Sequence, residues 1–394
     1  MSSVLIVGGA GYQGRNAARI LASRPGIDHL VLVDREGIAI DDVAAELGAD
    51  VTTDFVDVRD PSAVAALLRR HQPSVVLNCA GPFRIVGADS AAAAISTGTN
   101  YIDILDDAAV VPDYLALDDS ARAAGVTVIC GAGFTPGLTN IIGRVLAEGL
   151  DDVEQMHWSY LVNTTLAVAP HLMTHRVQMY GSDTRVVEDG ELVPVPGGSR
   201  MVDIEWPGVG TFKAGVCAHP EPLMAQRYFP TLRRASIRGC YTAPAFLELL
   251  AFLGNANFGS DTTFTSAGLE LRPDVLIGDF LGSDAFKSSR IWDQVLSAEQ
   301  EYGPVDGVRV AVSGRRDGVR VGRVLQYVSR ERWLTTHGVA AVAAELVATG
   351  AVDAPGVHSA EVLDPQLVLP ALRAAGIELG DFVESDAPEF HEVV

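Results

Sequence analysis

The sequence is poor in cysteine and in basic residues. Its four cysteines lie far apart, at Cys79, Cys130, Cys217 and Cys240, so neither a disulfide framework nor a zinc knuckle is expected. Lysine and arginine number 29 against 50 aspartate and glutamate residues, which gives a formal charge of -21. Such a charge disfavours a nucleic-acid partner. We also expect no metal site, because His171 and His175 have no third ligand beside them.

The sequence also lacks a long apolar run. No apolar stretch of about 18 residues free of charge is present, as a membrane-spanning helix requires. The first expected strand begins at residue 4 and leaves no room for a signal peptide, so we expect no membrane partner and a cytoplasmic location. The 394 residues exceed the usual size of one hydrophobic core and predict two domains.

The strongest local pattern is the hexapeptide Gly9-Ala-Gly-Tyr-Gln-Gly14. It follows the apolar run Val4 to Val7 and opens an amphipathic stretch, so it predicts a strand, a glycine turn and a helix. In such a turn the backbone amides and the helix N-terminus bind the pyrophosphate of a dinucleotide. We expect Gly9 to permit the turn, Gly11 to allow close approach of the cofactor, and Gly14 to let the helix pack on the strand.

An acidic residue follows where a dinucleotide fold needs it. The apolar run Leu30 to Val33 ends on Asp34, twenty residues beyond Gly14. A carboxylate here accepts both ribose hydroxyls and repels a 2′-phosphate, which favours NAD. Arg35, the next residue, could instead stack on adenine or pair with that phosphate. The expected cofactor is therefore NAD, with NADP as the alternative.

The first third of the chain alternates strand and helix. Strands are expected at residues 4–7, 30–34, 51–56, 74–79, 101–105 and 126–130. This spacing is typical of an α/β fold with a doubly wound parallel Rossmann sheet, whose ligand lies at the carboxyl ends of the strands.

The pattern changes after residue 136. Strands expected at 154–162, 176–180, 210–216, 308–313 and 319–327, with helices at 245–253 and 291–302, predict a second, α+β domain. Alanine-rich helices return from residue 337, and the end is acidic, with Glu384, Asp386, Glu389 and Glu392. We expect an NAD(P)-binding domain over residues 1–136 and 337–394. Residues 137–336 would form an inserted domain for substrate binding and dimerisation, in a homodimer.

Catalytic groups are expected where the later strands end, because the cofactor supplies the hydride and the protein holds the substrate. Tyr101 and Asp103 share one face of the fifth expected strand. Asp103 could orient an ammonium or imine, and Tyr101 could donate a proton or serve only as a strand aromatic. Cys130 ends a buried strand, where an inert packed thiol is the usual finding. These three residues are the catalytic candidates.

The other candidate residues fall into two groups. Those expected to bind the cofactor are Gly9, Gly11, Tyr12, Gln13, Gly14, Asp34, Arg35, Asp57, Val58, Cys79, Ala80, Gly81 and Pro82. Those expected to meet the substrate are Phe83, Thr135 and Arg176. An arginine can hold a substrate carboxylate through two hydrogen bonds, although it is commonly just a surface charge.

Four ordered motifs resemble the saccharopine dehydrogenase and saccharopine reductase family, which also includes carboxynorspermidine and lysine ε-dehydrogenase-like enzymes. The motifs are residues 8–14, 76–83, 98–103 and 133–140, and residues 356–365 resemble the family's C-terminal part. Saccharopine reductases typically carry an acid in a Cys-Gly-X-Asp-Pro-Gly loop. This chain has a longer loop from Cys130 to Gly137, with Thr135 in the acid's place.

The resemblance implies a pyridine-nucleotide dehydrogenase acting at a carbon–nitrogen bond, with C-terminal helices that return to the nucleotide domain. The expected function is NAD(P)-dependent reduction of an imine, or oxidation of an amine, on an amino-acid-like substrate. Two alternatives stay open. One is a carbonyl or enoyl reductase on the same scaffold, and the other is a nucleotide-binding protein without catalysis.

Overall fold

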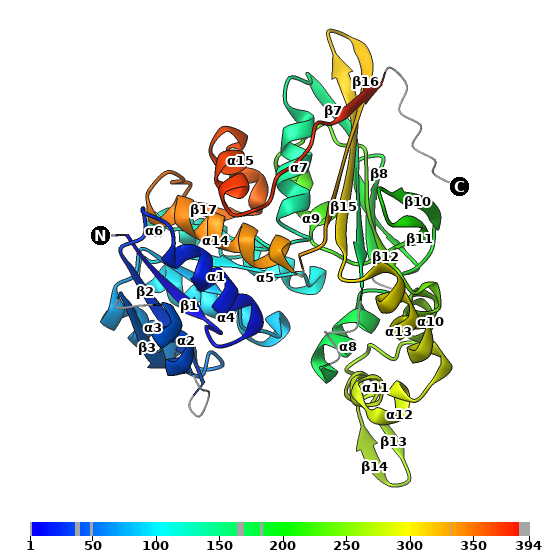
Figure 1. The fold of residues 1–394 in the computed structure, drawn as a ribbon, viewed down its shortest axis with the longest axis horizontal. Coiled ribbons are helices and arrows are strands. Elements are labelled where there is room, and N and C mark those ends of the chain that lie inside the picture. Colours follow the sequence, from blue (N-terminus) through cyan, green and yellow to red (C-terminus); the bar gives the residue numbers. More distant parts are fainter. Residues whose placement is uncertain are drawn as a thin grey trace. The chain divides into compact units, whose positions relative to one another are not determined.

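The computed structural model describes residues 2–35, 40–47, 50–163, 169–181, 184–331 and 333–385 (Figure 1). These residues form two compact units. The first unit extends to residue 145 and includes residues 333–379. The second unit begins at residue 146 and includes the end of the described chain from residue 380. No helix in the described ranges is long and apolar enough to cross a membrane.

The first unit contains a seven-stranded parallel sheet in the order β17-β6-β5-β4-β1-β2-β3. Its strands are β1 (Ser3–Val7), β2 (His29–Asp34), β3 (Val51–Phe55), β4 (Val75–Asn78), β5 (Asn100–Asp103), β6 (Thr127–Ile129) and β17 (Gly356–His358). The central strands are apolar and buried on both faces, as a parallel sheet between two helical layers requires. The predicted doubly wound α/β fold is confirmed, and β17 adds a seventh strand.

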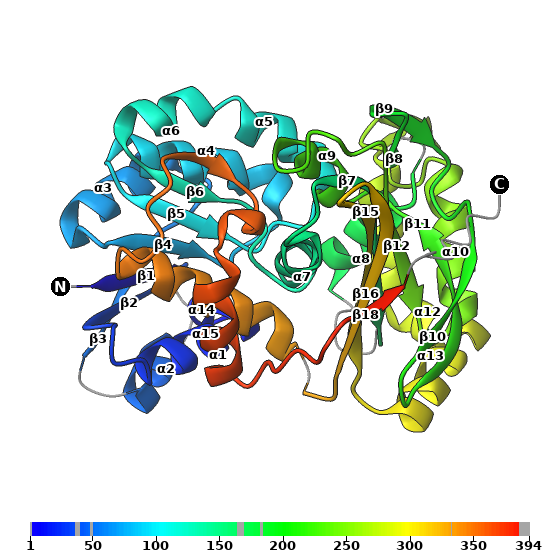
Figure 2. The same ribbon diagram turned by 90° about the horizontal axis from the view of Figure 1, so that it is seen from above.

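Helices cover both faces of this sheet (Figure 2). On one face α1 packs against α14, which packs against α15, and on the other α3 packs against α4. The helices of this unit are α1 (Tyr12–Ala22), α2 (Ile40–Leu47), α3 (Pro61–His71), α4 (Phe83–Ser96), α5 (Val111–Leu115), α6 (Asp118–Ala124), α14 (Leu334–Ala348) and α15 (Pro365–Ala374), with the short η1 (Ala108–Val110) and η3 (Ala360–Val362). Helix α7 (Leu138–Ala147) leads out of the unit. The strand order reverses between β1 and β4, where doubly wound folds bind their ligand.

The second unit is built on a nine-stranded mixed sheet with the path β10-β11-β12-β7-β15-β16-β18. Off this path, β8 pairs with β12 and β9 pairs with β8. Strands β12 and β7 run parallel, whereas β15 is antiparallel to both β7 and β16. The strands are β7 (Asp152–Val162), β8 (Thr184–Glu188), β9 (Glu191–Val195), β10 (Val202–Trp206), β11 (Gly210–Val216), β12 (Arg234–Tyr241), β15 (Asp306–Arg316), β16 (Val319–Ser329) and β18 (Val383–Ser385). The predicted α+β character of this region is confirmed.

The helices of the second unit include one where a strand was expected. They are α8 (Pro170–Gln178), α9 (Glu221–Met224), α10 (Pro244–Asn255), α11 (Pro273–Gly282), α12 (Asp284–Lys287) and α13 (Arg290–Tyr302), with η2 (Ala225–Arg227) and a hairpin of β13 (Phe264–Ser266) and β14 (Leu269–Leu271). The strand expected at 176–180 is wrong, because α8 occupies residues 170–178. Pro170 begins this helix, and Met173 and Val177 are buried four residues apart on one side of it.

The C-terminal end also differs from the sequence-based expectation. Residues 380–385 group with the second unit, because β18 pairs with β16. Glu384 accepts hydrogen bonds from Arg316 at 2.8 Å and from Arg323 at 2.9 Å, so it is not simply a solvated acid. Asp386, Glu389 and Glu392 lie outside the described residues. The segment returns to the second sheet because its carboxylate meets two arginines on β15 and β16.

Candidate functional site

The glycine turn follows β1 directly and is closed by backbone hydrogen bonds. The Gly11 amide donates to the Gly8 carbonyl at 3.0 Å, and the Gly9 amide donates to the Val33 carbonyl at 3.0 Å. Gly11 is exposed and precedes the first residue of α1. A free helix N-terminus thus opens at the carboxyl edge of the sheet, where it can receive a pyrophosphate.

The glycines divide their roles differently from the expectation. The positive φ, +75°, lies at Gly8 rather than at Gly9, so Gly8 carries the turn. A Cβ at Gly14 would lie 2.2 Å from the Gly8 oxygen, and a Cβ at Gly9 would lie 3.1 Å from the Leu32 side chain. Gly14 therefore packs helix on strand as expected. The absence of these side chains leaves the turn compact enough for a dinucleotide to approach its amides.

The adenosine side of the turn is acidic. One Asp34 oxygen accepts a hydrogen bond from the Ala10 amide at 3.2 Å, which holds the carboxylate beside the glycine turn. Asp57 and Val58 follow the neighbouring strand β3, and Asp57 bonds the Arg59 guanidinium at 2.9 Å. That hydrogen bond lowers the pKa of Asp57 to about 2. The exposed Arg35 lies directly before residues 36–39, which fall outside the described ranges.

The loop after β4 lies beside the glycine turn. The Cys79 amide donates to the Val7 carbonyl at 2.9 Å, and the Ala80 amide donates to the Asn78 side chain at 3.0 Å. Gly81 and Pro82 are exposed where α4 begins. Burial raises the pKa of the Cys79 thiol to about 12, so this cysteine is no nucleophile. The exposed part of the loop can line the nicotinamide ribose.

A buried polar cluster lies under the ends of β4 and β5. Asp103 is completely buried, and one of its oxygens accepts hydrogen bonds from the Gly131 amide at 2.9 Å and the Leu105 amide at 3.1 Å. Its other oxygen accepts a hydrogen bond from the Tyr114 hydroxyl. Burial raises the pKa of Asp103 to about 6. The carboxylate is thus used to hold the start of the loop after β6.

Tyr101 and Cys130 are equally buried. The Tyr101 hydroxyl accepts a hydrogen bond from the Asn78 side chain at 2.9 Å, and burial raises its pKa well above the usual value. The Cys130 thiol donates to the His358 carbonyl on β17 at 3.3 Å. The structure therefore unites Tyr101 and Asp103 in one cluster, with Asn78 and Tyr114 as members that the sequence analysis missed. Cys130 instead belongs to the contact between β6 and β17.

The loop 131–137 is a tight turn with little freedom. The Gly133 amide donates to the Pro136 carbonyl at 2.9 Å, and a Cβ at Gly137 would lie 2.1 Å from the Gly133 oxygen. The Asn140 side-chain oxygen accepts a hydrogen bond from the Gly137 amide at 2.7 Å. Its side-chain nitrogen donates to the buried Glu361 carboxylate at 2.7 Å. The motif ending at Asn140 and the C-terminal motif are thereby joined, and Thr135 is half-buried within the loop.

His337 was not found from the sequence. It lies on the first turn of α14, is 7% exposed and bonds the Gln13 side chain at 3.1 Å. Its ring also meets Tyr12 edge-on, with 6.1 Å between centroids. A lone histidine in an alanine-rich helix gives no signal by itself, because only the packing of α14 on α1 brings it to the glycine turn.

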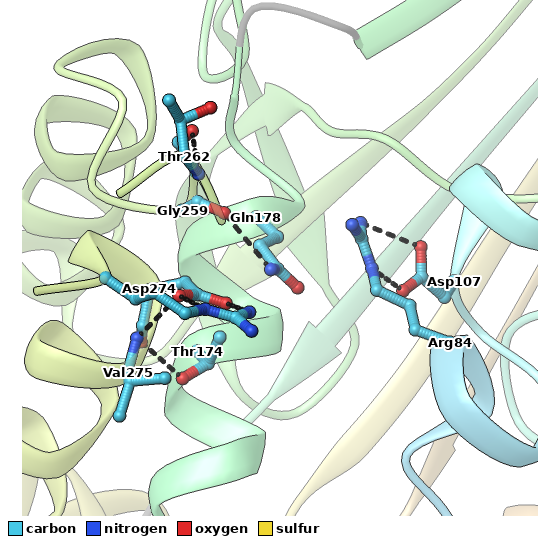
Figure 3. Close-up of polar contacts among 10 residues, drawn as sticks. Arg84, Asp107, Thr174, Gln178, Gly259, Thr262, Asp274 and Val275 are labelled. Carbon is cyan, nitrogen blue, oxygen red and sulfur yellow. Dashed lines mark hydrogen bonds and ion pairs between the residues drawn. The ribbon is translucent and has the colours of Figure 1, made fainter. Parts of the chain in front are cut away.

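The candidates for substrate contact are divided between the two units. Phe83 begins α4 in the first unit, next to Arg84, whose guanidinium pairs with Asp107 (Figure 3). Arg176 is half-buried on α8 in the second unit, where Met173 accepts a hydrogen bond from it at 3.9 Å.

Helix α8 is tied down by two further contacts. The Thr174 hydroxyl donates to the Asp274 carbonyl at 2.8 Å, and Gln178 donates to the Gly259 carbonyl at 3.1 Å (Figure 3). Within the ranges that the structure describes, no group of three histidine, cysteine or acidic residues could hold a metal ion.

Together, the doubly wound sheet, the glycine turn at its switch point and the acid after β2 define a dinucleotide-binding domain of the oxidoreductase type. Residues 4–129 match the family model described as the saccharopine dehydrogenase NADP binding domain. The match covers the nucleotide-binding part of the chain. The resemblance seen in the motifs is confirmed, and so is the expectation of an NAD(P) cofactor.

Two curated relatives and one solved structure extend the comparison. Carboxynorspermidine synthase of Vibrio alginolyticus is 27% identical over 199 residues, 45% of this chain and 46% of its own length. Carboxyaminopropylagmatine dehydrogenase of Synechocystis is 27% identical over 255 residues, 60% of this chain and 61% of its own length. The chain thus matches about half of each relative. Saccharopine dehydrogenase (L-Glu forming) of Saccharomyces cerevisiae has the same fold, with a TM-score of 0.65, 16% identity, and coverage of 98% of this chain and 100% of the other.

Proposed function

We propose that this protein is an NAD(P)-dependent oxidoreductase that reduces an imine, or oxidises an amine, on an amino-acid-like substrate. The observation that carries the proposal is the convergence of four motifs on one sheet edge. These are the glycine turn, the loop after β4, the end of β5 and the loop 131–137. The names of similar proteins support an amine or amino-acid-like substrate. These proteins are named after carboxynorspermidine, carboxyaminopropylagmatine and saccharopine.

The cofactor supplies or accepts the hydride, and the chain's own residues bind and orient the reactants. The amides around Gly11 would hold the pyrophosphate, and Asp34 would hold the adenosine ribose. The exposed backbone of Gly81 and Pro82 would line the nicotinamide ribose. In the reducing direction the imine carbon gains the hydride and the nitrogen gains one proton, which gives the amine. Thr135, Phe83 and Arg176 remain the proposed substrate contacts.

Asp103 takes a different role from the one expected at the sequence level. A carboxylate with no exposed surface cannot touch a substrate, and its oxygens already bond Gly131, Leu105 and Tyr114. We assign Asp103 as a positioning residue that acts through the loop 131–137. Because Tyr101 and Cys130 are also buried, we propose that neither touches the reacting atoms.

The cofactor preference follows from the charge beside the ribose. The Asp34 carboxylate is fixed by the Ala10 amide, so it cannot swing away from a 2′-phosphate. Its negative charge would repel that phosphate, which supports NAD as the preferred cofactor. Arg35 and Arg59 lie on the same side and are the residues through which NADP would compete.

The test is a panel of substrates, and the absorbance of the reduced cofactor measures turnover with each of them. Amines and amino acids are offered with NAD and NADP, and keto acids or aldehydes mixed with amines are offered with NADH and NADPH. We expect turnover with an amine or with an imine-forming pair. The Gly14→Ala variant, which blocks the glycine turn, serves as the control for contaminating dehydrogenases.

Two other outcomes would each replace the proposal. Turnover confined to ketones or enoyl thioesters without an amine would make the protein a carbonyl or enoyl reductase. Tight binding of NADH with no turnover across the whole panel would make it a nucleotide-binding protein without catalysis.

A further inference from the structure

Two arginines and a serine form a row across three strands of the second unit. In the register of the sheet, Ser159 on β7 lies beside Arg238 on β12 and beside Arg309 on β15. Residues paired in this way point to the same face of a sheet. Adjacent strands are about 4.8 Å apart, so the two arginines start about 10 Å apart with only a small side chain between them.

This row lies on the inner face of a curled sheet. Gln326 on β16 donates to the Glu205 carbonyl on β10 at 2.8 Å, although four strands separate β16 from β10 along the sheet. A Cβ at Gly307 would meet the Trp206 ring at 3.0 Å, which places β10 over the face that carries the row. The curl thus gives the face an apolar end around Trp206 and a polar end at the arginines.

The polar end is built of buried, hydrogen-bonded groups. Arg238 donates to the Ser236 hydroxyl at 2.7 Å and to the Arg200 carbonyl at 3.2 Å, and the Ser236 hydroxyl bonds His157 Nδ1 at 2.8 Å. His157, Ser159, Ser236 and Arg238 are each at most 5% exposed. Burial, followed by the charges of three arginines, lowers the pKa of His157 to about 3. The imidazole is therefore neutral and adds no charge to the row.

No acidic side chain among the described residues pairs with Arg309 on this face. Arg309 is partly buried, and it makes no hydrogen bond or ion pair with any residue in the described ranges. The charges that shift the pKa of the adjacent His157 all come from arginines. Removing a guanidinium from water without a partner is costly, and a like charge across a serine raises that cost further. An anion bound between the two arginines would remove both penalties.

We propose that Arg238 and Arg309 bind a small oxyanion, a carboxylate or phosphate group, over Ser159. The Arg309 guanidinium can direct two N–H groups at such an anion, Arg238 adds its positive charge beside it, and the serine hydroxyl can donate a further hydrogen bond. The partial exposure of Arg309 gives the anion its way in from solvent. The proposal does not depend on the reaction catalysed, because the row belongs entirely to the second unit.

The test is titration calorimetry of the full chain with inorganic phosphate and, separately, with acetate. Chloride keeps the ionic strength constant, and NADH is present at saturation so that phosphate does not report on the glycine turn. We expect saturable binding of at least one anion, weakened at least tenfold in Arg309→Gln. Arg185→Gln, which removes an exposed arginine of β8, should bind like the parent protein.

The two probes distinguish the two kinds of ligand. A phosphate site would bind inorganic phosphate, and a carboxylate site would bind acetate. Thermal unfolding without added anion checks that Arg309→Gln folds, and we expect its midpoint at or above that of the parent protein. Absence of saturable binding to either anion would overturn the proposal. Equal binding by the parent protein and Arg309→Gln would overturn it as well.

Discussion

Replacing Asp103 with asparagine should change how the stability of the protein depends on pH. Burial raises the pKa of this carboxyl from 3.8 to about 6, so the folded state holds the proton more tightly than the unfolded chain. The stability contributed by the protonated form is therefore complete below about pH 4 and is lost as the pH rises to about 6. At 1.36 kcal/mol per pKa unit, the loss amounts to about 3 kcal/mol.

Asparagine cannot ionise, so the Asp103→Asn variant does not lose this stability as the pH rises. Asparagine keeps an oxygen that can accept the hydrogen bonds from the amides of Gly131 and Leu105. We expect the difference in unfolding free energy between the variant and the parent protein to rise in favour of the variant by about 3 kcal/mol from pH 4 to pH 7. Urea unfolding followed by circular dichroism at several pH values measures this difference.

Asp57→Asn is the matched control. Hydrogen bonding to Arg59 lowers the pKa of Asp57 to about 2, so its contribution is lost only below about pH 4. Its difference from the parent protein should stay flat from pH 4 to pH 7. A flat difference for Asp103→Asn over that range, or one that falls as the pH rises, would refute the reasoning from the buried carboxyl.

Three further variants test the cofactor site. Gly14→Ala should lose NADH binding by at least about a hundredfold, as measured by fluorescence titration, because its Cβ would lie 2.2 Å from a backbone oxygen. Gly380→Ala, whose Cβ would meet no atom within 4 Å, should not. Asp34→Ser should raise kcat/KM with NADPH relative to NADH by about tenfold, and an unchanged ratio would remove Asp34 from ribose recognition. His337→Leu should raise the cofactor KM about three- to tenfold with kcat nearly unchanged, and His337→Gln should restore it, whereas a fall in kcat alone would contradict a positioning role.

The local patterns were sufficient to predict the cofactor domain. Strand, glycine turn and helix at Gly9 to Gly14 depend on neighbours in sequence, and Asp34 follows from the length of one βαβ unit. The buried strands are continuous apolar runs, so the sequence alone is enough to locate them. The strand predicted at residues 176–180 was wrong because the helical pattern begins outside that segment. The four-residue spacing of Met173 and Val177 becomes clear only once Pro170 is recognised as a helix start.

The sequence by itself thus determined the parallel sheet, the glycine turn and the acid at the end of β2, because these are set by contiguous residues. Tertiary structure decided the rest. It buried Asp103, it brought His337 to Gln13 from more than 300 positions away, and it placed Arg238 and Arg309 on either side of Ser159. Burial and contact between distant segments depend on how the elements pack, which no local pattern specifies.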